Sequence, residues 1–180
     1  MSAGNIHFAE KVNVVSGFLP VDMHTNPGPT SDWVCLKGYH RCAIVFFKGI
    51  GTNGDDPVIT LLQATAVAGT SSKALNITRV DKKQAASNLL ATGTYTLSTS
   101  ASAASHDTFS TNTWTNSDLA EQAAVVVIDV RAEDLDIDNG FDCIQANVAD
   151  VGTNAQLGCL LYMLHDPKYN QVPLTSAIVD

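Results

Sequence analysis

Two loop-forming segments have residue types and spacings that could support chemistry. The segment Gly49–Gly54 has the spacing GxGxxG and follows an apolar run, as in dinucleotide-binding loops. That chemistry needs a helix directly after the glycines, because the helix N-terminus binds the pyrophosphate. Here Asp55, Asp56 and Pro57 follow instead, and two carboxylates would repel phosphate. We therefore interpret the segment as the loop of a β-hairpin.

The second segment is acidic and resembles a calcium-binding EF-hand loop. Asp134, Asp136, Asp138 and Gly140 have nearly the required order, but the glycine falls one position late. Gln145 stands where the loop requires a bidentate glutamate. We interpret this stretch as a solvated turn, with an opportunistic calcium site as the alternative.

Histidines and cysteines form no recognisable catalytic or metal-binding motif. His165 precedes Asp166, but no serine elbow or comparable nucleophile accompanies the pair. The four cysteines form no CxxC pair, and three lie in apolar runs, so we expect buried thiols rather than disulfides or a zinc site. They are Cys35, Cys42, Cys143 and Cys159. We expect no catalytic residue, no cofactor and no bound metal.

Composition narrows the classes of partner. The chain of 180 residues has a net charge of -8 and no basic cluster, which argues against nucleic acid and against an anionic membrane surface. Its N-terminus lacks the pattern of a signal peptide, and no apolar run reaches the length of a transmembrane helix. Only 16% of the residues are charged, and a weakly charged surface suits large contacts with other protein chains.

Apolar runs predict strands rather than helices. Arg41–Lys48, Ala123–Val130 and Gly158–Leu164 are nearly continuous apolar runs, which is typical of strands buried on both faces. Ala74–Val80 and Phe141–Val148 alternate between apolar and polar residues, which is typical of half-buried strands. Further strands are expected at Val12–Val15, Trp33–Lys37, Pro57–Gln63 and Thr94–Thr99.

Segments between these runs are expected to be irregular. Asp81–Asn88 lacks an apolar stripe and is expected to be a loop or a single turn. Ser100–Asn116 is rich in serine and threonine and is expected to be an extended surface loop. We expect Arg41–Lys48 and Pro57–Gln63 to pair as the central hairpin of the core.

This pattern predicts an all-β fold. The expected form is an antiparallel β-sandwich, jelly-roll-like, of about eight strands with long loops and little helix. The length suits one domain over residues 1–180. In an alternative interpretation, residues 1–32 form an extended N-terminal arm outside that domain.

Aromatic residues suggest contacts with a glycan or a protein. Six of them could build a sugar platform, but most stand beside apolar strands and are expected to fill the core. They are Trp33, Tyr39, Phe109, Trp114, Tyr162 and Tyr169. Phe109 and Trp114 lie in the polar segment, so we expect them to contact another protein chain or, less often, a glycan.

Three segments resemble a family of small proteins encoded beside head genes in tailed bacteriophages and prophages. They are DWVCLKGYHRCAIVFFKGIGTNGDDPVITLLQAT, KALNITRV and VVVIDVRAEDLDIDNGFDCIQANVADVGTNAQLGCLLYMLHDPKY. The resemblance lies in the order of strands and turns and includes no catalytic motif. Within tailed phages, a small acidic β protein resembles a capsid decoration (cement) protein. The resemblance implies a non-enzymatic virion protein, made in the host cytoplasm, that binds the major capsid protein on the outer capsid surface, often as a homotrimer.

Such a protein would contact the capsid through its ends and loops. The expected contact residues lie in the N-terminal arm, in a Pro/Gly-rich loop and in the long polar segment. They are Asn5, Ile6, His7, Phe8, Asn26, Pro27, Pro29, Phe109 and Trp114. Two alternatives stay open: a head–tail connector or tail subunit, and a carbohydrate-binding β-sandwich module.

Overall fold

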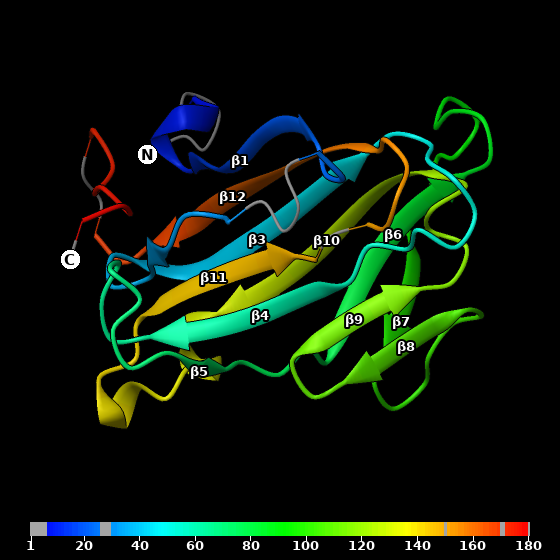
Figure 1. Cartoon of the computed structure of the whole chain (residues 1–180). Helices are drawn as coiled ribbons and strands as arrows, with labels where there is room; N and C mark the ends of the chain where they lie inside the picture. Colours follow the sequence, from blue (N-terminus) through cyan, green and yellow to red (C-terminus); the bar gives the residue numbers. More distant parts are fainter. Residues whose placement is uncertain (1–6, 26–29, 150, 170–171, 180) are drawn as a thin grey trace.

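The computed structural model describes residues 7–25, 30–149, 151–169 and 172–179. In these residues the chain forms twelve strands in two antiparallel sheets of six, packed face to face (Figure 1). The helical structure in the described residues consists of short 3-10 turns at Phe8–Glu10 (η2), Ala132–Asp134 (η3) and Ile137–Asn139 (η4). The predicted all-β sandwich is confirmed, with twelve strands rather than about eight.

The two sheets contain strands from distant parts of the sequence. The first has the order β1-β12-β3-β10-β6-β7, and the second has the order β2-β11-β4-β9-β8, with β5 paired to β4. The strands of the first are β1 (Asn13–Asp22), β3 (Tyr39–Lys48), β6 (Arg79–Ala85), β7 (Thr96–Thr99), β10 (Ala123–Arg131) and β12 (Leu157–Pro167). Those of the second are β2 (Val34–Cys35), β4 (Ile59–Ala64), β5 (Lys73–Ala74), β8 (Asp107–Ser110), β9 (Thr113–Asn116) and β11 (Cys143–Val148).

The hydrophobic core lies between the sheets, because each long strand turns alternate side chains inward. Ile44 and Phe46 of β3, Val126 of β10, and Ile59 and Leu61 of β4 belong to one cluster, and each is no more than 1% exposed. Full burial of such a side chain stabilises the fold by about 1.5–3 kcal/mol. This cluster therefore holds the two layers together.

Strands β3 and β4 do not form the predicted hairpin. β3 pairs with β10 and β12, whereas β4 pairs with β11, β5 and β9 in the opposite sheet. The connecting loop crosses from one layer to the other, and Gly51 N–H in it donates to Ala120 O at 2.7 Å. The hairpin prediction was wrong because an apolar pattern does not distinguish two arrangements. Two apolar strands can pair side by side in one sheet, or they can pack against each other across the core from opposite sheets.

Part of the proposed N-terminal arm is an edge strand of the sandwich. β1 pairs with β12 over Asn13–Asp22, and two register shifts interrupt the pairing. The strand continues through Gly17 and Pro20, which predict a break. A Cβ at Gly17 would lie only 2.2 Å from Leu160 Cδ2, so the close approach of β12 requires glycine there. Proline is tolerated because β1 is at the sheet edge.

Strand β6 occupies a segment whose sequence predicts a loop. A strand was expected over Ala74–Val80, but only Arg79 and Val80 of that range belong to β6. Lys82 points into the interior, is 3% exposed, and its Nζ lies 2.5 Å from Asp107 Oδ1. Because its inward position carries a lysine, β6 lacks the apolar alternation that identifies a half-buried strand.

The segment predicted as a long surface loop contains the hairpin β8–β9. Phe109 of β8 lies opposite Trp114 of β9. Trp114 is fully buried in the core, and Phe109 packs against the core while partly exposed. The prediction that Trp114 contacts a partner is therefore wrong for this fold, because the indole is already covered by the sandwich.

Candidate functional site

The outer face of the first sheet carries apolar side chains across four strands. In its central row, Leu161 of β12, Val45 of β3 and Val127 of β10 stand side by side. The row of Cys159, Phe47 and Val125 is also apolar, whereas the row of Met163 and Ala43 ends on Asp129 in β10. The edge strand β1 adds Val14 beside Met163. We call the following nine residues the apolar face: Val14, Ala43, Val45, Phe47, Val125, Val127, Cys159, Leu161 and Met163.

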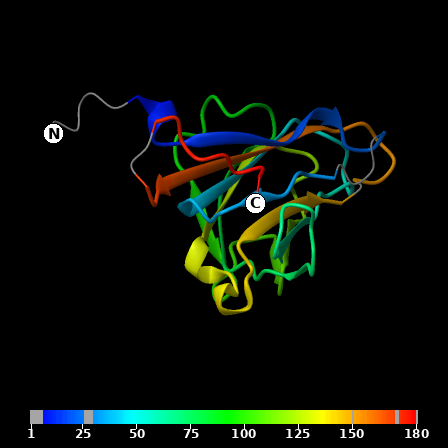
Figure 2. The ribbon, with the colours of Figure 1, turned by 90° about the vertical axis from the view of Figure 1, so that its left-hand side faces the viewer.

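The apolar face is open to solvent. Phe47 is 50% exposed, Val14 47% and Leu161 37%, and the other members are partly exposed. Seen along the layers in Figure 2, the second sheet covers only the inner side of the first. With strands ~4.8 Å apart and ~6.6 Å between neighbours on the same side of a strand, nine residues cover on the order of 300 Å². The largest apolar patch of a typical monomeric protein has about this size, and it is often a functional surface.

This face explains the nearly continuous apolar runs in the sequence. A strand with one face on a core and one in water alternates between apolar and polar residues. The middle parts of β3, β10 and β12 do not alternate, because their outward residues there are also apolar. Their composition suits a third layer on the outer side, and no described helix or strand supplies that layer. The arrangement can therefore bind another protein chain.

Charged groups border one end of the apolar face. Arg41 forms an ion pair with Asp129, and the imidazole of His165 lies 3.7 Å from Asp129 and 3.3 Å from Asp166. The rim is polar and the centre apolar, as in protein–protein interfaces. Within the face, burial raises the pKa of the Cys159 thiol, so this cysteine contributes packing area rather than a ready nucleophile.

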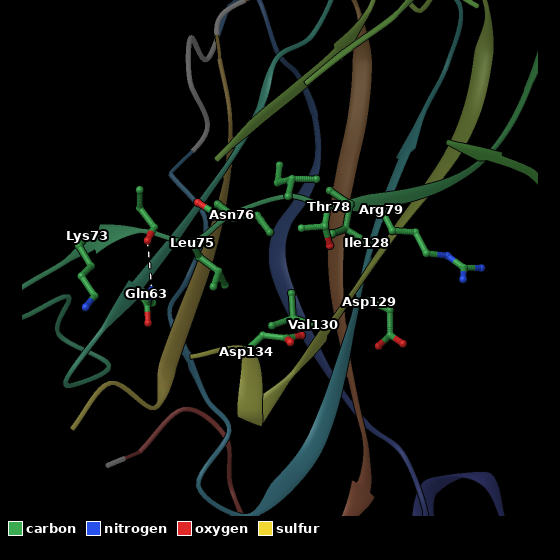
Figure 3. A pocket seen from close by; sticks show the side chains of 13 residues that line it. Gln63, Lys73, Leu75, Asn76, Thr78, Arg79, Ile128, Asp129, Val130 and Asp134 are labelled. Carbon is green, nitrogen blue, oxygen red and sulfur yellow. Dashed lines mark hydrogen bonds between the residues drawn. The ribbon is translucent and has the colours of Figure 1, made fainter. Parts of the chain in front are cut away.

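A pocket of about 470 Å³ lies between β10 and the segment 73–79 (Figure 3). Gln63 Nε2 donates to Ala74 O at its edge, at 3.1 Å. The charged side chains that line the pocket are already paired with neighbours. These pairs are Lys73 with Asp136, Arg79 with Asp81, Asp129 with Arg41, and Asp134 with Arg131. Among the residues lining this pocket, we find no convergent acid, base and nucleophile.

The two motif-like loops have structural roles. After Gly49–Gly54 the chain enters β4 rather than a helix. The carboxylate of Asp56 accepts the Ala120 N–H at 2.8 Å, and Asp55 accepts the Asn154 N–H at 3.1 Å, so both acids fix loops at the end of the sandwich. This arrangement does not have the geometry of a dinucleotide site.

The acidic turn holds its carboxylates apart from one another. It projects from one edge of the sandwich and contains η3 and η4 (Figure 2). Asp134 binds Arg131, whereas Asp136 binds Lys73 and accepts the Asn139 amide N–H at 2.8 Å. These contacts lower the pKa of Asp136, the hydrogen bond from Lys73 most strongly. In the described part of the chain, the carboxylates of this turn do not form a three-ligand group for calcium.

The expected contact residues fall into three groups. His7 and Phe8 lie at η2 beside β1, and Phe8 is 60% exposed and borders a groove with Pro173 and Leu174. Phe109 is partly exposed and Trp114 is buried, so of these two aromatic residues only Phe109 could contact a glycan. The remaining five lie outside the described residues: Asn5, Ile6, Asn26, Pro27 and Pro29.

The amino-acid sequence alone does not reveal the apolar face as a contact surface. Its signal was present in the three continuous apolar runs, which were interpreted as strands buried on both faces. The structure shows that the second sheet covers one of these faces, whereas the other is open to solvent.

Comparisons of this chain with protein-family models, with curated proteins and with solved structures found no match. In the described residues, none of the helical turns is long and apolar enough to span a membrane.

Proposed function

We propose that this protein is a non-enzymatic structural subunit that works by binding other protein chains. The observation that carries this proposal is the apolar face, a solvent-exposed patch on a sheet whose other side is already buried in the core. Burying apolar area yields roughly 25 cal/mol per Å², so about 300 Å² is a gross gain on the order of 7 kcal/mol per subunit before association costs.

The apolar face binds further copies of the same chain. The chain as a whole has a net charge of -8, which would oppose assembly through an acidic surface. The outward strand positions around this face instead combine Arg41, Lys83 and Arg131 with Asp81 and Asp129. Copies can therefore approach without strong like-charge repulsion. Three copies that turn this face toward a common axis would form a closed ring, consistent with the trimer that the resemblance implies.

In the virion, the assembled protein would serve as a decoration protein on the outer capsid surface. The family resemblance and the mixed, weakly charged surface support this role, and the exposed Phe8 beside β1 offers a contact point outside the apolar face. Each oligomer would contact several major capsid subunits at once. Multivalent binding gives a tight bridge from weak individual contacts, and the bridge opposes separation of the capsid subunits.

The test is the number and position of copies in purified particles. A decoration protein is present in numbers comparable with the capsid subunits and lies on the outer surface in a particle reconstruction. A ring of about a dozen copies at one vertex would identify a connector or tail subunit instead. Absence from particles would contradict any virion role.

A further inference from the structure

A pair of cysteines lies face to face where β2 meets β11. Cys35 is opposite Cys143 in the antiparallel pairing of these strands. The Leu36 N–H donates to Asp142 O at 2.7 Å, and the Cys35 N–H donates away from β11, to Ala177 O at 2.7 Å. The cysteine pair is therefore a non-hydrogen-bonded pair, the type in which the side chains of neighbouring strands lie closest.

A carboxylate completes a cluster of three ligand-type side chains. One ligand atom each from Cys35, Asp142 and Cys143 lies within 4.8 Å of the other two. The Cys143 thiol donates to Asp142 Oδ1 at 3.3 Å, and the Lys37 N–H donates to Cys35 Sγ at 3.4 Å. A tetrahedral zinc ion with Zn–S near 2.3 Å holds its ligand atoms about 3.5–3.8 Å apart. Small side-chain adjustments are enough to reach that geometry.

The surroundings favour a thiophilic cation. Cys35 is 4% exposed and Cys143 fully buried, and Ala64, Trp33 and Val67 pack around them. Asp142 is partly exposed, which leaves a route for an ion to enter. Without a cation both buried cysteines remain neutral thiols; a bound cation would replace their protons and compensate the three negative charges of two thiolates and a carboxylate. Thiolate ligands select zinc over calcium or magnesium, which prefer oxygen ligands.

We propose that Cys35, Cys143 and Asp142 bind one Zn²⁺ ion per chain, with the fourth coordination position open. The ion would tie the two-residue strand β2 to the start of β11 and stabilise the fold by binding only the folded chain. This inference does not depend on the proposed assembly, because the cluster lies in the second sheet and the apolar face belongs to the first.

The test uses full-length protein purified with a reductant, stripped with a chelator and titrated with Zn²⁺ alone. Wild type should retain about one zinc per chain after desalting, and its Tm should rise with zinc. The double variant Cys35→Ser/Cys143→Ser should lose this retention. Asp142→Asn, a partly exposed site, should weaken zinc affinity roughly tenfold or more. Cys159→Ser, in the other sheet, is the matched control and should bind zinc like wild type.

Circular dichroism without zinc shows whether each variant is folded, and Asp142→Asn keeps the proposal testable if the double variant is not. Equal zinc retention by wild type and a folded double variant would overturn the proposal. The proposal would also be overturned if the reduced wild-type protein takes up no zinc and oxidised glutathione instead links Cys35 to Cys143 in a disulfide. In that reaction the two thiols lose two electrons and two protons to the glutathione disulfide, which marks a redox pair.

Discussion

At the scale of single residues, two buried lysines are compensated in different ways. Lys48 is 1% exposed at the end of β3, and its Nζ donates to the backbone carbonyls of Leu119, Ala120 and Gln122. Lys82 of β6 instead pairs with the buried carboxylate of Asp107, which also accepts the Asn116 amide N–H at 2.7 Å. Both lysines join parts of the chain that are far apart in sequence.

Lys48 should make stability rise with pH on the alkaline side. Burial lowers its pKa from 10.5 to about 8, so between these values the unfolded chain holds a proton that the folded chain lacks. Folding therefore becomes more favourable as pH increases through this window, by up to about 3 kcal/mol. Urea unfolding from pH 8 to 10.5 should show wild type gaining stability relative to Lys48→Met. If the difference in unfolding free energy between wild type and Lys48→Met stays constant from pH 8 to 10.5, burial does not lower the pKa of Lys48.

Asp107→Asn should strongly destabilise the fold. It leaves the buried Lys82 ammonium without its carboxylate, and breaking a buried pair in this way costs about 3–5 kcal/mol. Asp81→Asn is the matched control, because the Arg79–Asp81 pair is exposed and such pairs contribute about 0–1 kcal/mol. Denaturant midpoints measure both changes. If the two variants lose similar unfolding free energy, Lys82 does not form a buried ion pair with Asp107.

At the scale of strands, the sequence predicted best where a run is apolar on both faces. β3, β10 and β12 were predicted to within a few residues, because valine, isoleucine and phenylalanine dominate β3 and β10 and leucine dominates β12. β6 and the β8–β9 hairpin were missed, because Lys82 and Trp114 acquire partners only when distant segments meet. The Cys35–Cys143 cluster was missed for the same reason: strand pairing, not sequence spacing, brings the ligands together.

The reactivity of Cys159 on β12 measures whether the apolar face is covered. It is partly exposed in the single chain, whereas Cys35, Cys42 and Cys143 are buried. If copies pack through this face, alkylation of Cys159 should slow markedly as the protein concentration rises through the association range. Mass spectrometry locates the modified cysteine, and Cys159→Ser should remove the concentration-dependent signal. Alkylation of Cys159 at the same rate in dilute and concentrated protein would contradict coverage of the face.

At the scale of the whole molecule, the sandwich could be predicted from the sequence, but the placement of strands in sheets could not. Local patterning shows that β3 and β4 are strands, yet it does not show that they lie in opposite layers. The same limit applies to function, because the outward side of an apolar strand becomes informative only once one layer is seen to cover the other side. The result is a domain with one buried core between its sheets and one apolar face open to solvent.

The central claim is that further copies of the chain cover the apolar face, and the native mass in solution tests it most directly. Light scattering on wild type should give a closed oligomer, a trimer if the resemblance holds. Leu161→Asp places a charge in the middle of the face and should give a folded monomer, whereas Thr108→Asp on the exposed side of β8 should assemble like wild type. A monomeric wild type, or a Leu161→Asp variant that assembles unchanged, would contradict the claim.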